Sequence, residues 1–180
     1  MKRILVTGAN KGIGLATVEN LLQNHPDTFL ILGSRDEKRG DEAVRLLTSK
    51  EPKWADRLMM LAIDVSNDES VTMAAEKVAS SFEADAKPLY GIINNAGIGS
   101  SSIGLEPTLQ VNTWGIHRVC EAFIPLLEAS GRIVNVTSAA GPNFVEAADD
   151  VTRTMLTDHD VQWDAVEEYM NRCISESKDY

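Results

Sequence analysis

A glycine-rich turn close to the N-terminus constrains the fold of this chain more than any other feature. Residues 4–6 form a short apolar run, Gly8, Gly12 and Gly14 follow it, and an amphipathic pattern begins directly afterwards. This order predicts a buried strand, a tight turn and the start of a helix. Gly8 can turn the chain sharply, Gly12 leaves room for a pyrophosphate beside the backbone, and Gly14 lets the helix pack close to the strand. The N–H groups at the start of the helix would then face the phosphates.

The spacing of these glycines is Gly-x-x-x-Gly-x-Gly, which differs from the commoner Gly-x-Gly-x-x-Gly pattern. No Lys-Ser or Lys-Thr pair follows Gly12 or Gly14, so the turn is not a Gly-x-x-x-x-Gly-Lys-Ser/Thr phosphate loop. The glycines could also serve only as a tight connection between a strand and a helix. The remainder of the chain has to separate these two interpretations.

The size, charge and hydropathy of the chain indicate one soluble globular domain. It has 180 residues, of which 43% are apolar and 24% charged, and this is enough for a sizeable core. The formal net charge of −10 argues against nucleic acid as a partner. No apolar run approaches the ~20 residues that span a bilayer, and the run behind Lys2 and Arg3 is too short for a signal peptide. We therefore expect a cytoplasmic protein, and the scattered cysteines and histidines predict no metal site.

Strand-like and helix-like segments alternate along most of the chain. The predicted strands cover residues 4–7, 29–32, 58–63, 89–93 and 132–136. The predicted helices cover residues 13–22, 37–48, a segment from Ser66 or Asn67 to Phe82, and 109–129. The expected apolar sides of the first three are Ile13, Ala16, Thr17 and Leu21, then Ala43, Val44, Leu46 and Leu47, then Val71, Ala74, Ala75 and Val78. This alternation predicts right-handed βαβ units in a Rossmann-type, doubly wound α/β fold with a parallel sheet of about five strands.

Glycine or polar residues follow the carboxyl end of each predicted strand. The glycine-rich turn comes after the first strand, and the later strands are followed by Arg35, Asp64, Asn94 and Ser138. Because ligands bind beyond the carboxyl ends of the strands in such sheets, we expect these five segments to meet at one edge.

Four motifs in this order resemble the short-chain dehydrogenase/reductase family. They are Thr7–Gly14, Asn94–Gly97, Asn112 within Val111–Gly115, and Ser138 within Val134–Gly141. The resemblance covers residues 1–141. Within that family the chain looks most like the NADPH-dependent carbonyl reductases that carry an insertion before the catalytic tyrosine. The segments similar to that subgroup are residues 10–14, 34–36, 64–66, 94–98 and 118–127.

The resemblance implies NADP(H) as the cofactor. Lys11 in the glycine-rich turn and Arg35 beyond the second strand would form a cationic clamp for the 2′-phosphate that distinguishes NADP from NAD. Asp36 adjoins Arg35, an arrangement that also suits the subgroup, and two solvated surface cations are the alternative interpretation. The implied cofactor-binding residues are Gly8, Asn10, Lys11, Gly12, Ile13, Gly14, Arg35, Asp64, Val65, Asn94, Ala96, Gly97 and Val111.

The resemblance also implies a reaction, the reduction of ketones, aldehydes or quinones by hydride transfer from the nicotinamide. Ser138 would hydrogen-bond the carbonyl oxygen, and Asn112 would hold a water molecule in the proton relay. The proton donor of the family is a tyrosine four residues before a lysine, whose charge lowers the tyrosine pKa. This sequence departs from that pattern, because no lysine lies four residues after Tyr90, Tyr169 or Tyr180.

Residues 142–180 look like the helical insertion of the carbonyl reductase subgroup. From residue 146 onwards the sequence has ten acidic residues against three basic ones. A helix capped by Thr157 or Asp160 would present an apolar stripe of Val161, Ala165, Tyr169 and Cys173, joined by Val166, Met170 and Ile174. Its opposite face would carry Asp164, Glu167, Glu168 and Arg172.

These observations predict how the chain is organised. We expect residues 1–141 to form an NADP-binding Rossmann domain, and residues 142–180 to form a helical, acidic segment packed on the same domain. The chain stops about where the Tyr-Lys segment of the family begins, so we expect a truncated product that lacks its C-terminal strands. The fifth strand would then be a bare sheet edge unless the acidic helices cover it.

Several functions are compatible with the sequence. The first hypothesis is the cofactor-binding portion of an NADPH-dependent carbonyl reductase, with little or no turnover by these 180 residues alone. The alternative is a non-catalytic NADP(H)-binding module, and a flavin-binding protein with five strands is a third hypothesis. The expected partner is a small carbonyl substrate, and neither nucleic acid nor a membrane is expected. The resemblance implies a monomer, because the insertion covers the helices through which relatives dimerise.

Overall fold

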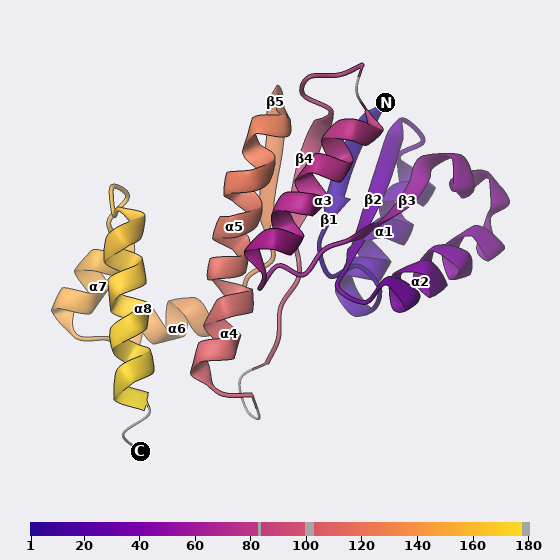
Figure 1. Cartoon of the computed structure of the whole chain (residues 1–180). Helices are drawn as coiled ribbons and strands as arrows, with labels where there is room; N and C mark the ends of the chain where they lie inside the picture. Colours follow the sequence, from indigo (N-terminus) through magenta and orange to yellow (C-terminus); the bar gives the residue numbers. More distant parts are fainter. Residues whose placement is uncertain (83, 100–102, 178–180) are drawn as a thin grey trace.

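A five-stranded parallel sheet with helices on both faces forms the body of the computed structural model (Figure 1). The structure describes residues 1–82, 84–99 and 103–177. The strand order is β3-β2-β1-β4-β5, and every neighbouring pair is parallel. The strands are β1 (Lys2–Val6), β2 (Thr28–Ser34), β3 (Leu58–Ala62), β4 (Leu89–Asn94) and β5 (Leu127–Asn135). The predicted doubly wound α/β fold is confirmed.

Each face of the sheet has its own apolar core. One core lies under α1 (Gly12–Asn24) and α2 (Glu37–Lys50), and the other under α3 (Asp68–Ser81) and α5 (Trp114–Phe123). Because both faces are covered, the adjacent residues Leu5 and Val6 of β1 are both fully buried, one in each core. The helix α4 (Leu105–Asn112) precedes α5, and short 3-10 helices cover Pro52–Arg57 and Ile124–Leu126.

The third helix matches its prediction. All four residues of the expected apolar side are buried, namely Val71, Ala74, Ala75 and Val78. Of the two candidate caps, Asn67 is the one used, because its side chain accepts a 2.8 Å hydrogen bond from the backbone N–H of Ser70.

The first two helices match their predicted apolar sides only in part. The residues that they bury are Gly14, Val18 and Leu22 in α1, and Gly40, Ala43 and Leu47 in α2. Ile13 is 69% exposed and Leu46 is 48% exposed, so the expected sides were wrong at these positions. Apolar residues occur on more than one side of both helices, and hydrophobic spacing alone does not choose between those sides. Close packing at the glycines decides the rotation of each helix about its own axis.

The long helix predicted over residues 109–129 is also wrong. It breaks at Thr113, whose φ of −124° and ψ of −64° are not helical, and α5 ends at Phe123. Pro125 lies in the following 3-10 helix, and β5 already begins at Leu127. Proline lacks the N–H group that a continuing helix needs, which explains the early end.

Three helices follow β5, and the last of them packs on α4 and α5. They are α6 (Ala140–Ala147), α7 (Asp150–Thr157) and α8 (Trp163–Ser177), and residues 178–180 of the predicted segment lie outside the described residues. Met170 and Ile174 of α8 are buried against Trp114. The Nε1 of Trp114 also donates a 2.7 Å hydrogen bond to Glu167 Oε1.

The predicted stripe of this helix is correct in part, because Val166, Met170 and Ile174 do pack against the rest of the chain, whereas Val161, Ala165, Tyr169 and Cys173 are only half-buried. Its buried residues are Met170 and Ile174, with Trp163 and Val166 partly buried beside them. Glu167, expected on the opposite face, turns towards Trp114. Neither proposed cap is adjacent to α8, because the helix starts only at residue 163. Trp114 provides the surface on which Met170 and Ile174 are buried, and the sequence of α8 alone does not identify that surface.

The strand β5 has an open edge. Within the described part of the chain it pairs with β4 alone, and α7 and α8 lie beside α4, away from β5 (Figure 1). Ile133 is 38%, Val134 50% and Val136 43% exposed. The expected bare edge is therefore present among the described residues. None of the described helices is long and apolar enough to cross a membrane.

Candidate functional site

The turns that follow β1 to β4 enclose one cleft at the carboxyl edge of the sheet. Its volume is about 580 Å³, and it lies where the strand order reverses around β1, as ligand sites in such sheets do. It is lined by Gly8, Asn10, Lys11, Gly12, Ile13, Arg35, Asp36, Arg39, Ile63, Asp64, Val65, Asn95, Ala96, Gly97, Ile98 and Val111. All the predicted cofactor residues except Gly14 and Asn94 are in this set.

The three glycines of the first turn have different structural roles. Gly8 and Gly12 have positive φ values of 63° and 57°, a conformation that favours glycine. A Cβ atom on Gly8 would lie 2.8 Å from the Cα of Ala96, whereas one on Gly12 would meet nothing within 4 Å. The space above Gly12 is therefore open to a ligand.

Gly14 contributes to packing instead of lining the cleft. A Cβ atom at this position would lie 2.5 Å from Asn95 Nδ2 and 2.7 Å from the backbone oxygen of Gly8. The absence of a side chain thus lets α1 approach the turn, which is the role that the sequence predicted for this glycine.

Hydrogen bonds fasten the turn after β4 to the turn after β1. The Oγ1 of Thr7 accepts from the backbone N–H groups of Asn95 and Ala96, each at 3.0 Å. In return, Asn95 Nδ2 donates to the backbone oxygens of Thr7 and Gly8, at 2.9 and 3.2 Å. Asn95 is a site residue that the sequence analysis missed, although the Asn-Asn pair offered a signal.

Asn94 takes no part in lining the cleft. Its side chain is buried, and its Nδ2 donates a 2.9 Å hydrogen bond to Asn135 Oδ1 in β5. Successive side chains of a strand point in opposite directions, so only one of the two asparagines can face the cleft. Beside it, burial raises the pKa of the Cys120 thiol, whose sulfur lies 3.7 Å from Asn94 Nδ2.

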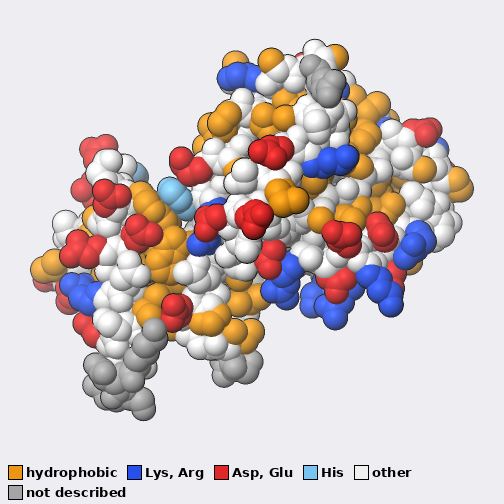
Figure 2. Space-filling view, in the orientation of Figure 1, with side chains coloured by type: hydrophobic (Ala, Val, Ile, Leu, Met, Phe, Trp, Pro, Cys, Tyr) orange, Lys and Arg blue, Asp and Glu red, His pale blue; other side chains and the backbone are white. Residues whose placement is uncertain are grey.

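Three cations stand on the side of the cleft formed by the first two turns. Lys11 and Arg35 are exposed, and neither side chain forms a hydrogen bond or ion pair with another described residue. Arg39, in the first turn of α2, was not predicted, although this helix begins only two residues after Arg35. Figure 2 shows basic side chains gathered around the start of α2.

Asp36 is the acidic residue closest in sequence to these cations, and it is held by its own helix. It caps α2 by accepting a 3.0 Å hydrogen bond from the backbone N–H of Arg39. Its other oxygen lies 3.4 Å from Arg39 Nε. Both carboxylate oxygens are therefore engaged, which leaves Lys11 and Arg35 as the unpaired charges of these turns.

Asp64 and Val65 follow β3 on the opposite side of the cleft. The Oδ1 of Asp64 accepts hydrogen bonds from the backbone N–H and the hydroxyl of Ser66, at 3.0 and 2.6 Å. Its own N–H donates to Ser70 Oγ at 2.9 Å. These contacts fix the carboxylate at the start of α3, within reach of a ligand in the cleft.

The two predicted catalytic residues are placed differently from each other. Both ends of the Asn112 carboxamide are engaged with Ile98, whose N–H donates to Oδ1 and whose oxygen accepts from Nδ2, each at 2.9 Å. The side chain thus clamps the loop after β4 onto α4. Ser138 lies beyond β5, is exposed, and is not among the lining residues; its Oγ accepts a 3.2 Å hydrogen bond from the N–H of Ala140.

The described residues contain no group of three or more His, Cys, Asp or Glu side chains that could hold a metal ion. The site is instead a cleft of backbone turns with cations on one side, which suits a phosphorylated ligand.

The chain is similar in sequence to proteins of known activity. Residues 2–148 match the family model described as short chain dehydrogenase. The chain is 36% identical over 149 residues to the mitochondrial D-beta-hydroxybutyrate dehydrogenase of Bos taurus, covering 78% of this chain and 42% of that one. It is 27% identical over 183 residues to carbonyl reductase [NADPH] 1 of Rattus norvegicus, covering 97% and 62%. The chain thus spans about half the length of these curated relatives.

A solved structure extends the likeness through the C-terminal helices. Menthone neomenthol reductase from Mentha piperita superimposes with a TM-score of 0.81 at 25% identity. The match covers 99% of this chain and 75% of that one. The helices after β5 therefore have counterparts in an enzyme of this fold.

Proposed function

The chain belongs to the short-chain dehydrogenase/reductase family, and on that premise we propose that its cleft binds NADP(H) for the reduction of carbonyl compounds. Membership makes it part of an oxidoreductase family. We propose further that the cofactor is the phosphorylated dinucleotide and that the substrates are ketones, aldehydes or quinones.

The observation that carries the proposal is the charge on the turns after β1 and β2. An NAD-binding site places a carboxylate where the ribose 2′-hydroxyl lies, and an NADP-binding site places a cation near the 2′-phosphate. Asp36 is held by Arg39 and the start of α2, while Lys11 and Arg35 are unpaired among the described residues. Two free cations beside an engaged carboxylate favour the phosphorylated dinucleotide. The similarity to rat carbonyl reductase [NADPH] over 97% of this chain supports the same choice.

The remaining residues of the cleft suit the other parts of the cofactor. The open backbone at Gly12 and the first N–H groups of α1 would bind the pyrophosphate. Asp64 and Val65 would bind the adenine, and the backbone at Ala96 and Gly97 would lie along a ribose. The nicotinamide supplies the hydride when it is bound, and the protein contributes orientation.

A non-catalytic NADP(H)-binding module is the second candidate. Two observations favour it for this chain. No tyrosine in the sequence has a lysine four residues later. Ser138 also lies apart from the lining of the cleft, and the side chain of Asn112 is engaged at both ends. We infer that the 180 residues bind the cofactor but turn over little substrate.

Calorimetric titration of the folded chain with NADPH tests the binding part of the proposal. Saturable heat supports it, and no heat from soluble, folded protein contradicts it. Steady-state NADPH oxidation with a quinone then separates the two candidates. Turnover that Ser138→Ala abolishes would support an active reductase, whereas binding without turnover supports the module.

We further propose that the chain is a monomer in the cytoplasm. Helix α8 covers part of α4 and α5 through Met170 and Ile174, which supports the monomer. Sedimentation velocity would give a mass near 19.7 kDa if this is correct.

A further inference from the structure

We propose that a groove between α7 and α8 docks a basic, amphipathic segment of a partner polypeptide. The groove has a volume of about 670 Å³ and shares no lining residue with the cofactor cleft. Its floor is made of Val151, Met155, Val161 and Ala165. We call this hollow the α7–α8 groove.

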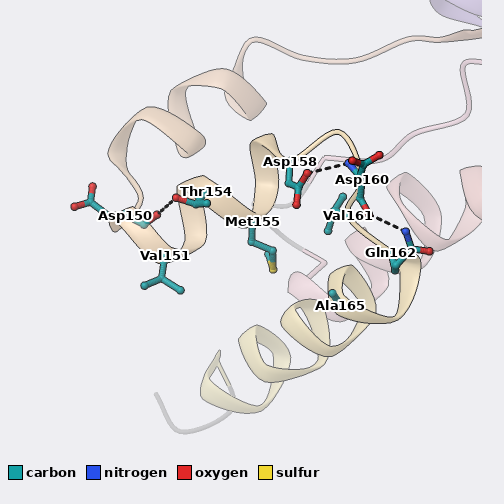
Figure 3. A pocket seen from close by; sticks show the side chains of 9 residues that line it. All are labelled: Asp150, Val151, Thr154, Met155, Asp158, Asp160, Val161, Gln162 and Ala165. Atoms are coloured by element: carbon teal, nitrogen blue, oxygen red, sulfur yellow. Dashed lines mark hydrogen bonds between the residues drawn. The ribbon is translucent and has the colours of Figure 1, made fainter.

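The floor of the groove is apolar and open to solvent. Figure 3 shows Met155 and Val161 projecting between α7 and α8, towards Ala165. Val151 is 81% exposed, the largest exposed fraction of any large apolar residue in the described chain. Val151 lies on α7, whose other exposed residues are mostly polar. Its side chain is therefore available for contact with an apolar side chain of a partner.

Carboxylates stand at both ends of this floor. Asp150 lies at one end, and Asp158 and Asp160 at the other (Figure 3). Asp150 pairs with Arg153 at 3.1 Å, but its side chain is 97% exposed. Neither Asp158 nor Asp160 forms an ion pair with a described residue; Asp158 Oδ1 accepts only the backbone N–H of Asp160, at 2.9 Å. The groove therefore suits a ligand that has an apolar middle and positive charges at both ends.

Charge complementarity selects the partner. Residues 146–180 contain ten acidic and three basic side chains, which gives a net charge of −7. This field repels nucleic acid and anionic membrane surfaces and attracts cationic segments. A helix or extended segment with apolar residues on one side, flanked by Lys or Arg, would bury its apolar side on Val151 and Met155 and bring its cations to the aspartates.

The probe for the test is a fluorescein-labelled amphipathic peptide of leucine and lysine, followed by anisotropy on the full 180-residue chain. A peptide of the same composition in scrambled order, without an apolar side, is the reference. We expect saturable binding of the amphipathic peptide only, weakened at least tenfold by raising the salt concentration from 50 to about 500 mM. Equal binding of the scrambled peptide, or no effect of salt, would overturn the proposal.

Variants of the groove test its position. Val151→Ser should weaken peptide binding about fivefold to tenfold, because an apolar contact is lost. Asp158→Asn together with Asp160→Asn should weaken it similarly and flatten the salt dependence. Matched changes elsewhere, Met73→Ser on α3 and Asp27→Asn before β2, should leave it unaltered. Unchanged binding in the groove variants overturns the proposal, and the unaltered circular dichroism of each variant shows that it is folded.

Two further readouts distinguish other occupants. Displacement of the peptide by an equimolar simple alkylamine would assign the groove to a small organic cation. A dimer in sedimentation that Val151→Ser dissolves would assign it to a second copy of this chain. Either result contradicts the proposal, while the titration with NADPH tests the cofactor cleft separately.

Discussion

Hydrogen bonds join Asn95 to Thr7 beside the cleft: the N–H of Asn95 donates to Thr7 Oγ1 at 3.0 Å, and Asn95 Nδ2 donates to the Thr7 backbone oxygen at 2.9 Å. The two residues are 88 positions apart in sequence. This pair holds the turn after β4 against the glycine-rich turn, so the shape of the proposed cofactor site depends on it.

Asn95→Ala should therefore lower both stability and cofactor affinity. The free energy of unfolding should fall by about 1–3 kcal/mol, because the variant leaves the backbone oxygens of Thr7 and Gly8 without these donors. Urea denaturation followed by circular dichroism measures this loss. Asn24→Ala, at an exposed position of α1, is the control and should change stability much less, because the Asn24 side chain bonds only to Asn20 of the same helix. Equal losses in the two variants would contradict the prediction.

Substitutions of two glycines should separate folding from binding. Gly8→Ala places a Cβ atom 2.8 Å from the Cα of Ala96 and should cost about 2 kcal/mol or more, since backbone must move. Gly12→Ala meets no atom within 4 Å, so it should cost only the ~1 kcal/mol of its left-handed conformation.

Gly12→Ala should lower NADPH affinity much more than it lowers stability. The added methyl group would occupy the space in which we propose that the pyrophosphate binds, so the folded variant should bind NADPH at least tenfold more weakly. Thermal unfolding and calorimetry on the same samples give both quantities. Wild-type affinity in Gly12→Ala would show that no phosphate lies over this residue.

The preference for NADPH over NADH should depend on Arg35. Arg35→Ala removes a charged partner of the 2′-phosphate, an interaction of about 1.5–3 kcal/mol, and should weaken NADPH binding about tenfold or more while NADH binding stays constant. Arg45→Ala, an exposed arginine on α2 outside the cleft, is the matched control. Identical titration curves for the two dinucleotides with wild-type protein would rule out the proposed role of Arg35.

Asp149 should titrate below an ordinary aspartate. Hydrogen bonds from the backbone N–H of Thr152, and then from its hydroxyl, lower the pKa of this carboxyl from 3.8. Because the pKa is lower in the folded chain, the cap stabilises α7 above pH 3.8 and loses its effect as the pH falls through the folded value.

Carboxyl carbon shifts in an NMR titration measure this directly. Thr152→Val removes only the hydroxyl contribution, so the depression of the Asp149 pKa should shrink but persist through the backbone N–H. A pKa at or above 3.8 in the wild-type chain would contradict the capping geometry.

Much of the fold was predictable, because local hydrophobic patterns indicate which segments form strands and which form helices. The glycine spacing located the turn after β1, and buried positions at helical spacing located α3 with its cap at Asn67. The order of strands and helices was enough to predict a parallel sheet and the edge at which the cleft lies. The family was also recognisable from the motifs along the chain.

Other features depended on contacts that a local pattern does not contain. Trp114 donates a hydrogen bond to Glu167, which the helical pattern of α8 placed on the opposite face, and Gly14 of α1 packs closely against Asn95. The alternation of side chains at the end of β4 places Asn95 at the cleft and sends Asn94 towards β5. The local sequence makes both asparagines equally plausible, so only their position in the sheet separates them.

By itself, the sequence determined the elements, their order and the turns that can bind phosphate, since these follow from backbone freedom and hydrophobic spacing over a few residues. The tertiary structure alone decided which cations stay unpaired, with Asp36 held by Arg39 and Lys11 and Arg35 left free. It also decided that Ser138 lies apart from the cleft lining. Charge pairing and relative placement arise only when distant segments meet, because a side chain's partners are set by packing and not by its neighbours along the chain.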